Sequence, residues 1–156
     1  MEDITLKEII DYARINEDNA RQFYLDAALH AKRDNVKGFL KALAKQEERH
    51  IDHLNELEKV VEAGGPIPKP HGITKPLGYA DYVGSVRIDA DADYQDVLKF
   101  AMAKEKEALD SYEKYSRLVD DPRAKDLFML LAGEESEHLR GFEDKYDDFM
   151  KEIENW

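Results

Sequence analysis

The 156-residue chain contains no cysteine, and this absence excludes several classes of chemistry. Without thiols the protein has no disulfide framework, no thiol nucleophile and no cysteine-bound iron–sulfur cluster. A zinc or iron site that depends on paired CxxC motifs is excluded for the same reason. The chemistry of this chain must therefore come from other side chains.

Long apolar runs and an excess of basic residues are also missing. No apolar segment approaches the roughly 20 residues of a membrane span. With 23 Lys and Arg against 35 Asp and Glu, the formal net charge of −12 argues against binding to a nucleic-acid backbone. The first residues show neither the basic segment nor the apolar core of a signal peptide. We therefore expect a cytoplasmic protein that binds neither membranes nor nucleic acid.

Proline is scarce, and its distribution divides the chain. Four of the five prolines fall within residues 64–93, whereas the remaining sequence carries apolar residues at the spacing of amphipathic helices. Thr5 and Glu8 form a capping-box pattern at the start of the first helical segment. We expect a single domain, residues 1–156, with helices at about 5–33, 35–63, 94–119 and 122–154 and a long crossover at 64–93.

One spacing occurs twice and carries most of the functional information. Two Glu, Glu, His triplets share the same internal intervals of 30 and 33 residues: Glu17, Glu47 and His50, and Glu105, Glu135 and His138. The second triplet follows the first by 88 residues, and the same offset separates Tyr24 from Tyr112. A single Glu-x-x-His is common by chance when 37% of residues are charged. Two copies in register with two further glutamates indicate a duplicated metal-binding hairpin.

Antiparallel packing of the helices would bring the two triplets together. Residue 32, midway between Glu17 and Glu47, falls at the first expected turn, so the members of that triplet lie level along their hairpin. The same holds for the second triplet around residue 120, and a crossover of about 30 residues can travel the length of a bundle. Four buried carboxylates require cations, and two divalent metals neutralise them. Carboxylate oxygens with imidazole nitrogens suit iron or manganese, and zinc also accepts such ligands.

Four segments carry a resemblance to a known family: Glu17-x-x-Ala20-x-x-Phe23-Tyr24, Glu47-Glu48-Arg49-His50, Glu105-Lys106-Glu107-Ala108 and Glu134-Glu135-Ser136-Glu137-His138. They resemble the ferritin-like domain of the rubrerythrin family over all four expected helices. Di-iron carboxylate proteins share one arrangement of ligands. Two helices each contribute one glutamate, and the other two helices each contribute a Glu-x-x-His pair. The resemblance implies an all-α, ferritin-like four-helix bundle of two antiparallel hairpins with a non-haem di-iron centre.

The resemblance also implies a role for each ligand. The bridging carboxylates correspond to Glu47 and Glu135, the terminal carboxylates to Glu17 and Glu105, and the imidazole ligands to His50 and His138. Tyr24 and Tyr112, about two helical turns beyond their glutamates, correspond to tyrosines that hydrogen-bond the ligand carboxylates and tune or protect the site. His53 follows His50 by one turn, but its counterpart in the second half is Gly141, so we do not expect it to be a ligand.

Two departures from the family pattern shape the expected function. Typical members carry a four-cysteine rubredoxin domain that delivers electrons, and many have a further glutamate one turn after the third-helix ligand, where this chain has Ala108. We expect a homodimeric peroxidase that uses two iron ions to reduce hydrogen peroxide, or dioxygen, in oxidative-stress defence. Its electrons would come from a separate rubredoxin or flavoprotein. Two alternatives stay open: a ferroxidase that handles or stores iron, and a bundle that binds iron, manganese or zinc without turnover.

Overall fold

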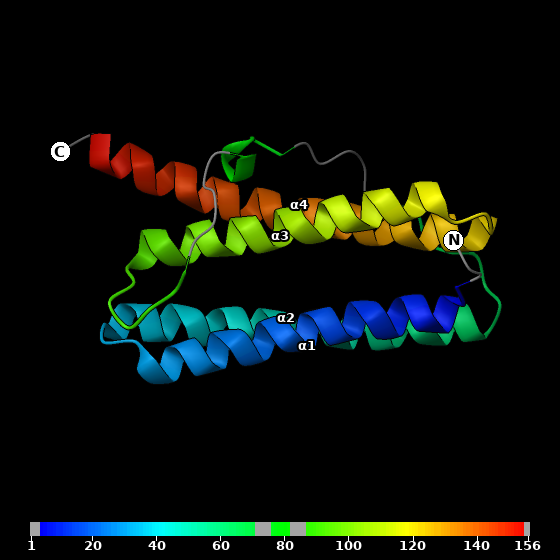
Figure 1. Ribbon diagram of the computed structural model, residues 1–156, viewed down its shortest axis with the longest axis horizontal. Helices are drawn as coiled ribbons and strands as arrows, with labels where there is room; N and C mark the ends of the chain where they lie inside the picture. Colours follow the sequence, from blue (N-terminus) through cyan, green and yellow to red (C-terminus); the bar gives the residue numbers. More distant parts are fainter. Residues whose placement is uncertain (1–3, 71–75, 82–86, 155–156) are drawn as a thin grey trace.

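The computed structural model describes residues 4–70, 76–81 and 87–154, and its described residues form an all-α bundle (Figure 1). The elements in chain order are α1 (Leu6–His30), α2 (Asp34–Glu62), the short 3₁₀ helix η1 (Tyr79–Asp81), α3 (Tyr94–Leu118) and α4 (Pro122–Glu154). The four-helix architecture predicted from the sequence is confirmed. Residues 71–75 and 82–86 of the predicted crossover lie outside the described residues.

The first helix shows how local sequence sets the helix ends. The side chain of Thr5 accepts a hydrogen bond from the Glu8 backbone at 3.1 Å, and the Glu8 carboxylate accepts one from the Thr5 N–H at 3.3 Å. This capping box satisfies two N–H groups that the helix leaves free. α1 ends at His30, earlier than predicted, because Ala31 is extended and the N–H of Lys32 bonds to the carbonyl of Ala90.

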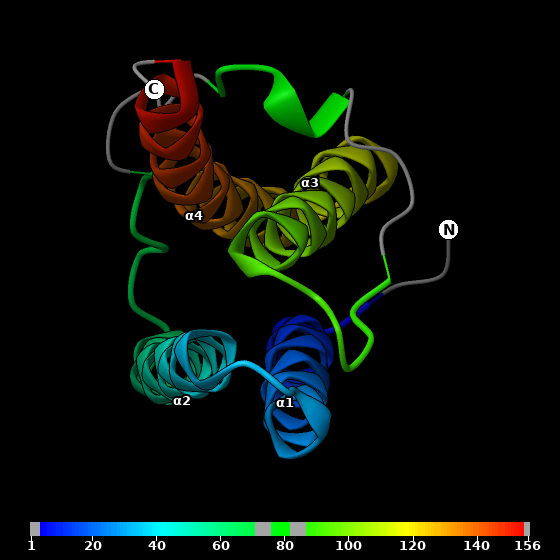
Figure 2. The same ribbon diagram turned by 90° about the vertical axis from the view of Figure 1, so that its left-hand side faces the viewer.

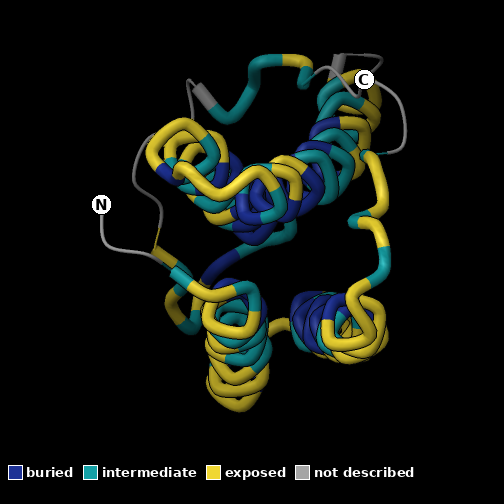
Figure 3. Tube along the Cα trace, turned by 90° about the vertical axis from the view of Figure 1, so that its right-hand side faces the viewer, coloured by how far each residue is buried: buried dark blue, intermediate teal, exposed yellow. Residues whose placement is uncertain are grey.

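The helices pair as two antiparallel hairpins, α1 with α2 and α3 with α4 (Figure 1). Seen from one end, the hairpins form two layers, and the described residues between α2 and α3 lie outside the four helices (Figure 2). Buried residues lie on the helix sides that face one another, and exposed residues lie on the outer sides (Figure 3). Apolar side chains from all four helices form the core, among them Ile9, Leu43, Leu98, Leu127 and Leu139. No helix of the described part of the chain is long and apolar enough to cross a membrane.

A buried carboxylate on α4 anchors the crossover. Glu143 is fully buried, and its two oxygens accept hydrogen bonds from the backbone N–H groups of Leu77 at 2.8 Å and Tyr79 at 2.7 Å. The Tyr79 hydroxyl donates to Asp147, also on α4, at 2.6 Å. These bonds compensate the burial of the Glu143 carboxylate and hold η1 against the outer side of the second hairpin.

Candidate metal centre

The six side chains predicted as ligands gather into two groups within the bundle. In each group three ligand atoms lie within 4.8 Å of one another, and either group could hold a metal ion: Glu17, Glu47 and His50, and Glu105, Glu135 and His138. α1 and α3 each contribute one glutamate, and α2 and α4 each contribute a Glu-x-x-His pair whose members share a helix face. The structure therefore brings together the same triplets that the sequence repeat indicates.

The first group is held by close contacts around one imidazole. The Nδ1 atom of His50 lies 3.4 Å from a carboxylate oxygen of Glu17 and 3.2 Å from one of Glu47. Glu47 is buried, and the side chain of Glu17 is 12% exposed. The three ligand atoms thus converge from two helices onto one point.

The second group has the same arrangement with wider spacing. The Nδ1 atom of His138 lies 3.7 Å from Glu105 and 3.6 Å from Glu135. This nitrogen is buried and has no hydrogen-bond partner among the described residues. Buried polar atoms are nearly always paired, so an unpaired ring nitrogen facing two carboxylates fits a site that a cation completes.

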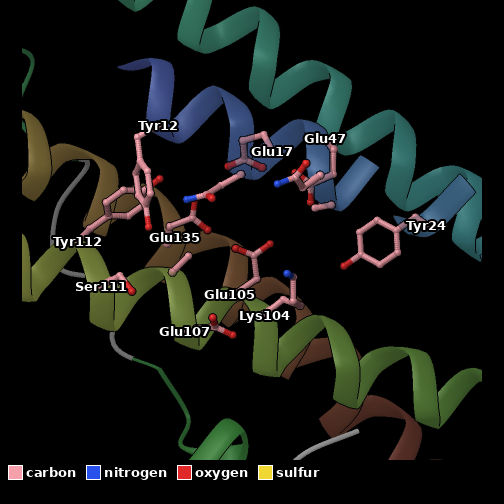
Figure 4. Close-up of a pocket in the computed structure, with 14 residues that line it drawn as sticks. Tyr12, Glu17, Tyr24, Glu47, Lys104, Glu105, Glu107, Ser111, Tyr112 and Glu135 are labelled. Carbon is pink, nitrogen blue, oxygen red and sulfur yellow. The ribbon is translucent and has the colours of Figure 1, made fainter. Parts of the chain in front are cut away.

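The two groups adjoin across the hairpins. The imidazole rings of His50 and His138 stack with centroids 3.8 Å apart. The four glutamates line one cavity of about 140 Å³, and Figure 4 shows Glu17 and Glu47 on one side of it with Glu105 and Glu135 opposite. Ala108 also lines this cavity, so the position one turn after Glu105 faces the site without offering a carboxylate. The six residues therefore form one centre with two halves.

Burial dominates the electrostatics of this centre. It raises the pKa of Glu47 to about 8, that of Glu105 to about 7, and that of Glu135 well above its ordinary value. Burial acts the same way on Glu17, but hydrogen bonds, chiefly with His50, outweigh it and lower the pKa to about 2. Burial lowers the pKa of His50, yet its hydrogen bonds with Glu17 and Glu47 raise it to about 10. The metal-free centre therefore balances its charge with protons, which bound metal ions would displace.

The two predicted tyrosines flank the glutamates. Tyr24 and Tyr112 are both 1% exposed and line the glutamate cavity (Figure 4). Burial, followed by the negative charge of nearby glutamates, raises the pKa of both hydroxyls. Within the described part of the chain no hydrogen bond joins either hydroxyl to a carboxylate, so the predicted hydrogen-bonding role stays a prediction.

Sequence reasoning missed one polar pair beside the centre. The Nε2 atom of His53 on α2 lies 2.7 Å from a carboxylate oxygen of Glu134 on α4. Both residues line a second hollow that reaches His50 and His138. The internal repeat could not reveal this pair, because the counterpart of His53 in the second half is Gly141.

The fold and the centre define a four-helix protein with two adjoining carboxylate–histidine groups of the kind that hold a pair of metal ions. The family model described as Rubrerythrin matches residues 8–146, and the chain belongs to the rubrerythrin family. Membership implies a di-iron oxidoreductase or ferritin-like function, and the family typically binds iron. No rubredoxin domain is evident in the chain. A search of curated proteins found no match.

Proposed function

We propose that the chain is a non-haem di-iron oxidoreductase that reduces hydrogen peroxide. In this proposal Glu47 and Glu135 would be the bridging carboxylates, Glu17 and Glu105 the terminal carboxylates, and His50 and His138 the imidazole ligands of the two iron ions. One observation carries the proposal. The two Glu–Glu–His groups adjoin, because their imidazole rings stack and their four glutamates line the same cavity. Separate, unrelated carboxylate clusters would not meet in this way.

The ligand set suits the proposed chemistry. A pair of ferrous ions supplies two electrons, the number that converts one hydrogen peroxide and two protons into two waters. The four carboxylates balance the charge of two divalent ions, and the two imidazoles complete the ligand set. The cavity of about 140 Å³ has room for peroxide or dioxygen but not for a large organic substrate. An external donor, such as a separate rubredoxin or flavoprotein, would return the two electrons.

Anaerobic loading with ferrous iron followed by one equivalent of peroxide tests the proposal. A parallel sample receives air, and near-ultraviolet absorption is followed in time for both samples. Two irons per chain, with oxidation faster by peroxide than by air, is the expected result. The metal-free protein, treated with peroxide in the same way, is the control for direct oxidation of side chains.

The other outcomes separate the remaining functions. Faster oxidation by air with continued uptake beyond two irons per chain would replace the proposal with ferroxidase or storage activity. Tight binding of two metals without any response to either oxidant would replace it with a metal-binding role. Manganese and zinc, loaded separately, show whether the centre selects iron.

A further inference from the structure

The second hollow, between α2 and α4, reaches the histidine side of the candidate centre. Its volume is about 230 Å³, and four of the six candidate ligands line it: Glu17, His50, Glu135 and His138. Both imidazoles line this hollow, and neither is among the described residues that line the glutamate cavity. The side chains of His50 and His138 are 22% and 24% exposed, whereas those of the four glutamates are at most 12% exposed. Solvent therefore approaches the centre most closely through this hollow.

Two polar residues meet across this hollow, one on α2 and one on α4. The two helices run in opposite directions (Figure 1). His53 lies about one turn after the ligand imidazole of α2, and Glu134 lies about one turn before the ligand imidazole of α4. The two residues are therefore level with each other, and the Nε2 atom of His53 is 2.7 Å from a carboxylate oxygen of Glu134. The side chain of His53 is 60% exposed, so this pair is open to solvent.

The charges and the walls of the hollow suit a cation. Glu134 and Glu137 add two carboxylates beyond the candidate ligands, and no lysine or arginine is among the described residues that line the hollow. The remaining wall is largely apolar and includes the buried side chains of Ala13, Leu54 and Leu131. A cleft with charges of one sign and low-dielectric walls concentrates ions of the opposite sign. The hollow should therefore attract cations from solvent.

The glutamate cavity, on the side of α1 and α3, has a different polar lining. Its exposed charged residues are Lys104 and Glu107, both on α3, and their charges are opposite (Figure 4). Asn16 and Asn19 line the cavity from α1. Amide groups and a balanced pair of charges do not concentrate cations, so the two sides of the centre differ in the species that they attract.

We propose that divalent cations enter the centre through the hollow between α2 and α4, and that His53, Glu134 and Glu137 bind the entering cation first. The proposal rests on the candidate metal centre but not on its reaction with peroxide. The imidazole of His53 and the carboxylate of Glu134 separate and offer one ligand atom each in place of hydration water. Among the described residues these two belong to neither group of three ligand atoms, so they hold a cation weakly enough to pass it on. The next ligands in the hollow are His50 and His138.

The rate of cobalt(II) uptake by the metal-free full chain tests this route without any redox step. Cobalt(II) accepts carboxylate and imidazole ligands, and its visible absorption changes when they replace water. The double variant Glu134→Gln with Glu137→Gln removes two charges and leaves all six candidate ligands in place, so its association with excess cobalt(II) chloride is expected to be about tenfold slower. Release of bound cobalt to a chelator is expected to slow by the same factor, because the equilibrium affinity depends on the unchanged ligands. A centre loosened by the substitutions would instead release cobalt faster.

The double variant Glu107→Gln with Glu113→Gln is the matched control. Both residues are exposed on α3 and belong to neither group of candidate ligands, and Glu107 lines the glutamate cavity. The change in net charge is the same, and both rates are expected to equal those of the unaltered protein. His53→Gln removes the imidazole from the hollow and is expected to slow association as well. Circular dichroism of each variant shows whether the helices persist.

The ionic strength of the solution gives a second readout. Added salt screens the attraction between the hollow and a cation, so association should slow with salt more steeply in the unaltered protein than in the variant that lacks the Glu134 and Glu137 charges. A purely structural role of these two residues would leave both salt dependences equal.

The remaining outcomes separate the route from the proposed function. Association at the unaltered rate in the Glu134 and Glu137 double variant would overturn the route. Equal slowing in the α3 control would also overturn it, because net charge rather than the hollow would then govern uptake. An unaltered protein that binds no cobalt would overturn both the route and the centre. Cobalt uptake that depends on Glu134 and Glu137, in a protein whose ferrous form does not react with peroxide, would overturn the peroxidase proposal and leave the route standing.

Discussion

The imidazole rings of His50 on α2 and His138 on α4 stack with centroids 3.8 Å apart and planes 9° from parallel. This contact joins the two copies of the repeated triplet, and so it joins the two hairpins at the level of the candidate centre. Burial disfavours a charged His50, but hydrogen bonds with Glu17 and Glu47 raise its pKa to about 10. The proton held there in the metal-free protein occupies the place of a cation. A bound metal ion would replace it and leave the imidazole as a neutral ligand.

The bridging assignment predicts the effect of removing one glutamate. Glu47→Ala or Glu135→Ala should abolish occupancy by two metals while the helices persist, because each change removes a ligand shared by both ions. The iron content per chain after desalting measures the metal occupancy, and circular dichroism shows whether the helices persist. Glu48→Ala is the matched control, because Glu48 is an exposed neighbour outside both groups, and it should retain two irons. Tight binding of two irons by Glu47→Ala would exclude the bridging role.

The metal-free protein should lose stability as the pH rises from about 5 to about 8. Chiefly through burial, the pKa of Glu47 rises from 4.5 to about 8 and that of Glu105 from 4.5 to about 7. A carboxyl group whose pKa is raised by folding binds its proton more tightly in the folded protein than in the unfolded chain. Its contribution to the free energy of unfolding is therefore complete below pH 4.5 and is lost as the pH rises through the folded pKa values of about 7 and 8. His50 adds to this loss above its ordinary value of 6.5, whereas the lowered pKa of Glu17 acts only below 4.5.

Urea midpoints at several pH values measure this dependence. Glu47→Gln, which cannot ionise at that position, should show a shallower decline in the metal-free state. Saturating divalent metal should reverse the trend, since ions replace the protons and bind more tightly as protons leave. A metal-free protein whose stability rises steadily across this interval would contradict the buried, proton-balanced centre described above.

The two groups of candidate ligands could be predicted from the sequence because they repeat. The 88-residue offset and the helical periodicity place Glu47 and His50 on one helix face, and the same reasoning holds for Glu135 and His138. Neither signal exists for contacts that occur once and join distant segments. Glu143 bonds to backbone groups 64 and 66 residues away, and its burial on α4 depends on where the crossover lies. Such contacts depend on tertiary packing that local pattern does not encode.

Gly133→Ala should destabilise the protein through the crossover. A Cβ at Gly133 would lie 2.7 Å from the Cβ of Pro70, so either the crossover or α4 must move. Overpacking of this kind typically costs about 1–3 kcal/mol. Gly141→Ala on the same helix is the control, because nothing lies within 4 Å of the added methyl group. In Gly141→Ala the gain in helix propensity should stabilise the protein by about 0.5–1 kcal/mol. Urea unfolding should therefore show a lower midpoint for Gly133→Ala and a higher midpoint for Gly141→Ala than for the unaltered protein.

Glu143→Ala should release the crossover from α4. The change leaves the N–H groups of Leu77 and Tyr79 without their acceptor, at a cost of about 1–3 kcal/mol for each N–H group that stays buried. Faster cleavage of the crossover in limited proteolysis and a lower urea midpoint are the expected results. Asp144→Ala removes the neighbouring carboxylate, which pairs with Arg140 on the surface and contributes at most about 1 kcal/mol. Equal proteolysis of the two variants would show that general loss of α4 stability, rather than the Glu143 anchor, governs the crossover.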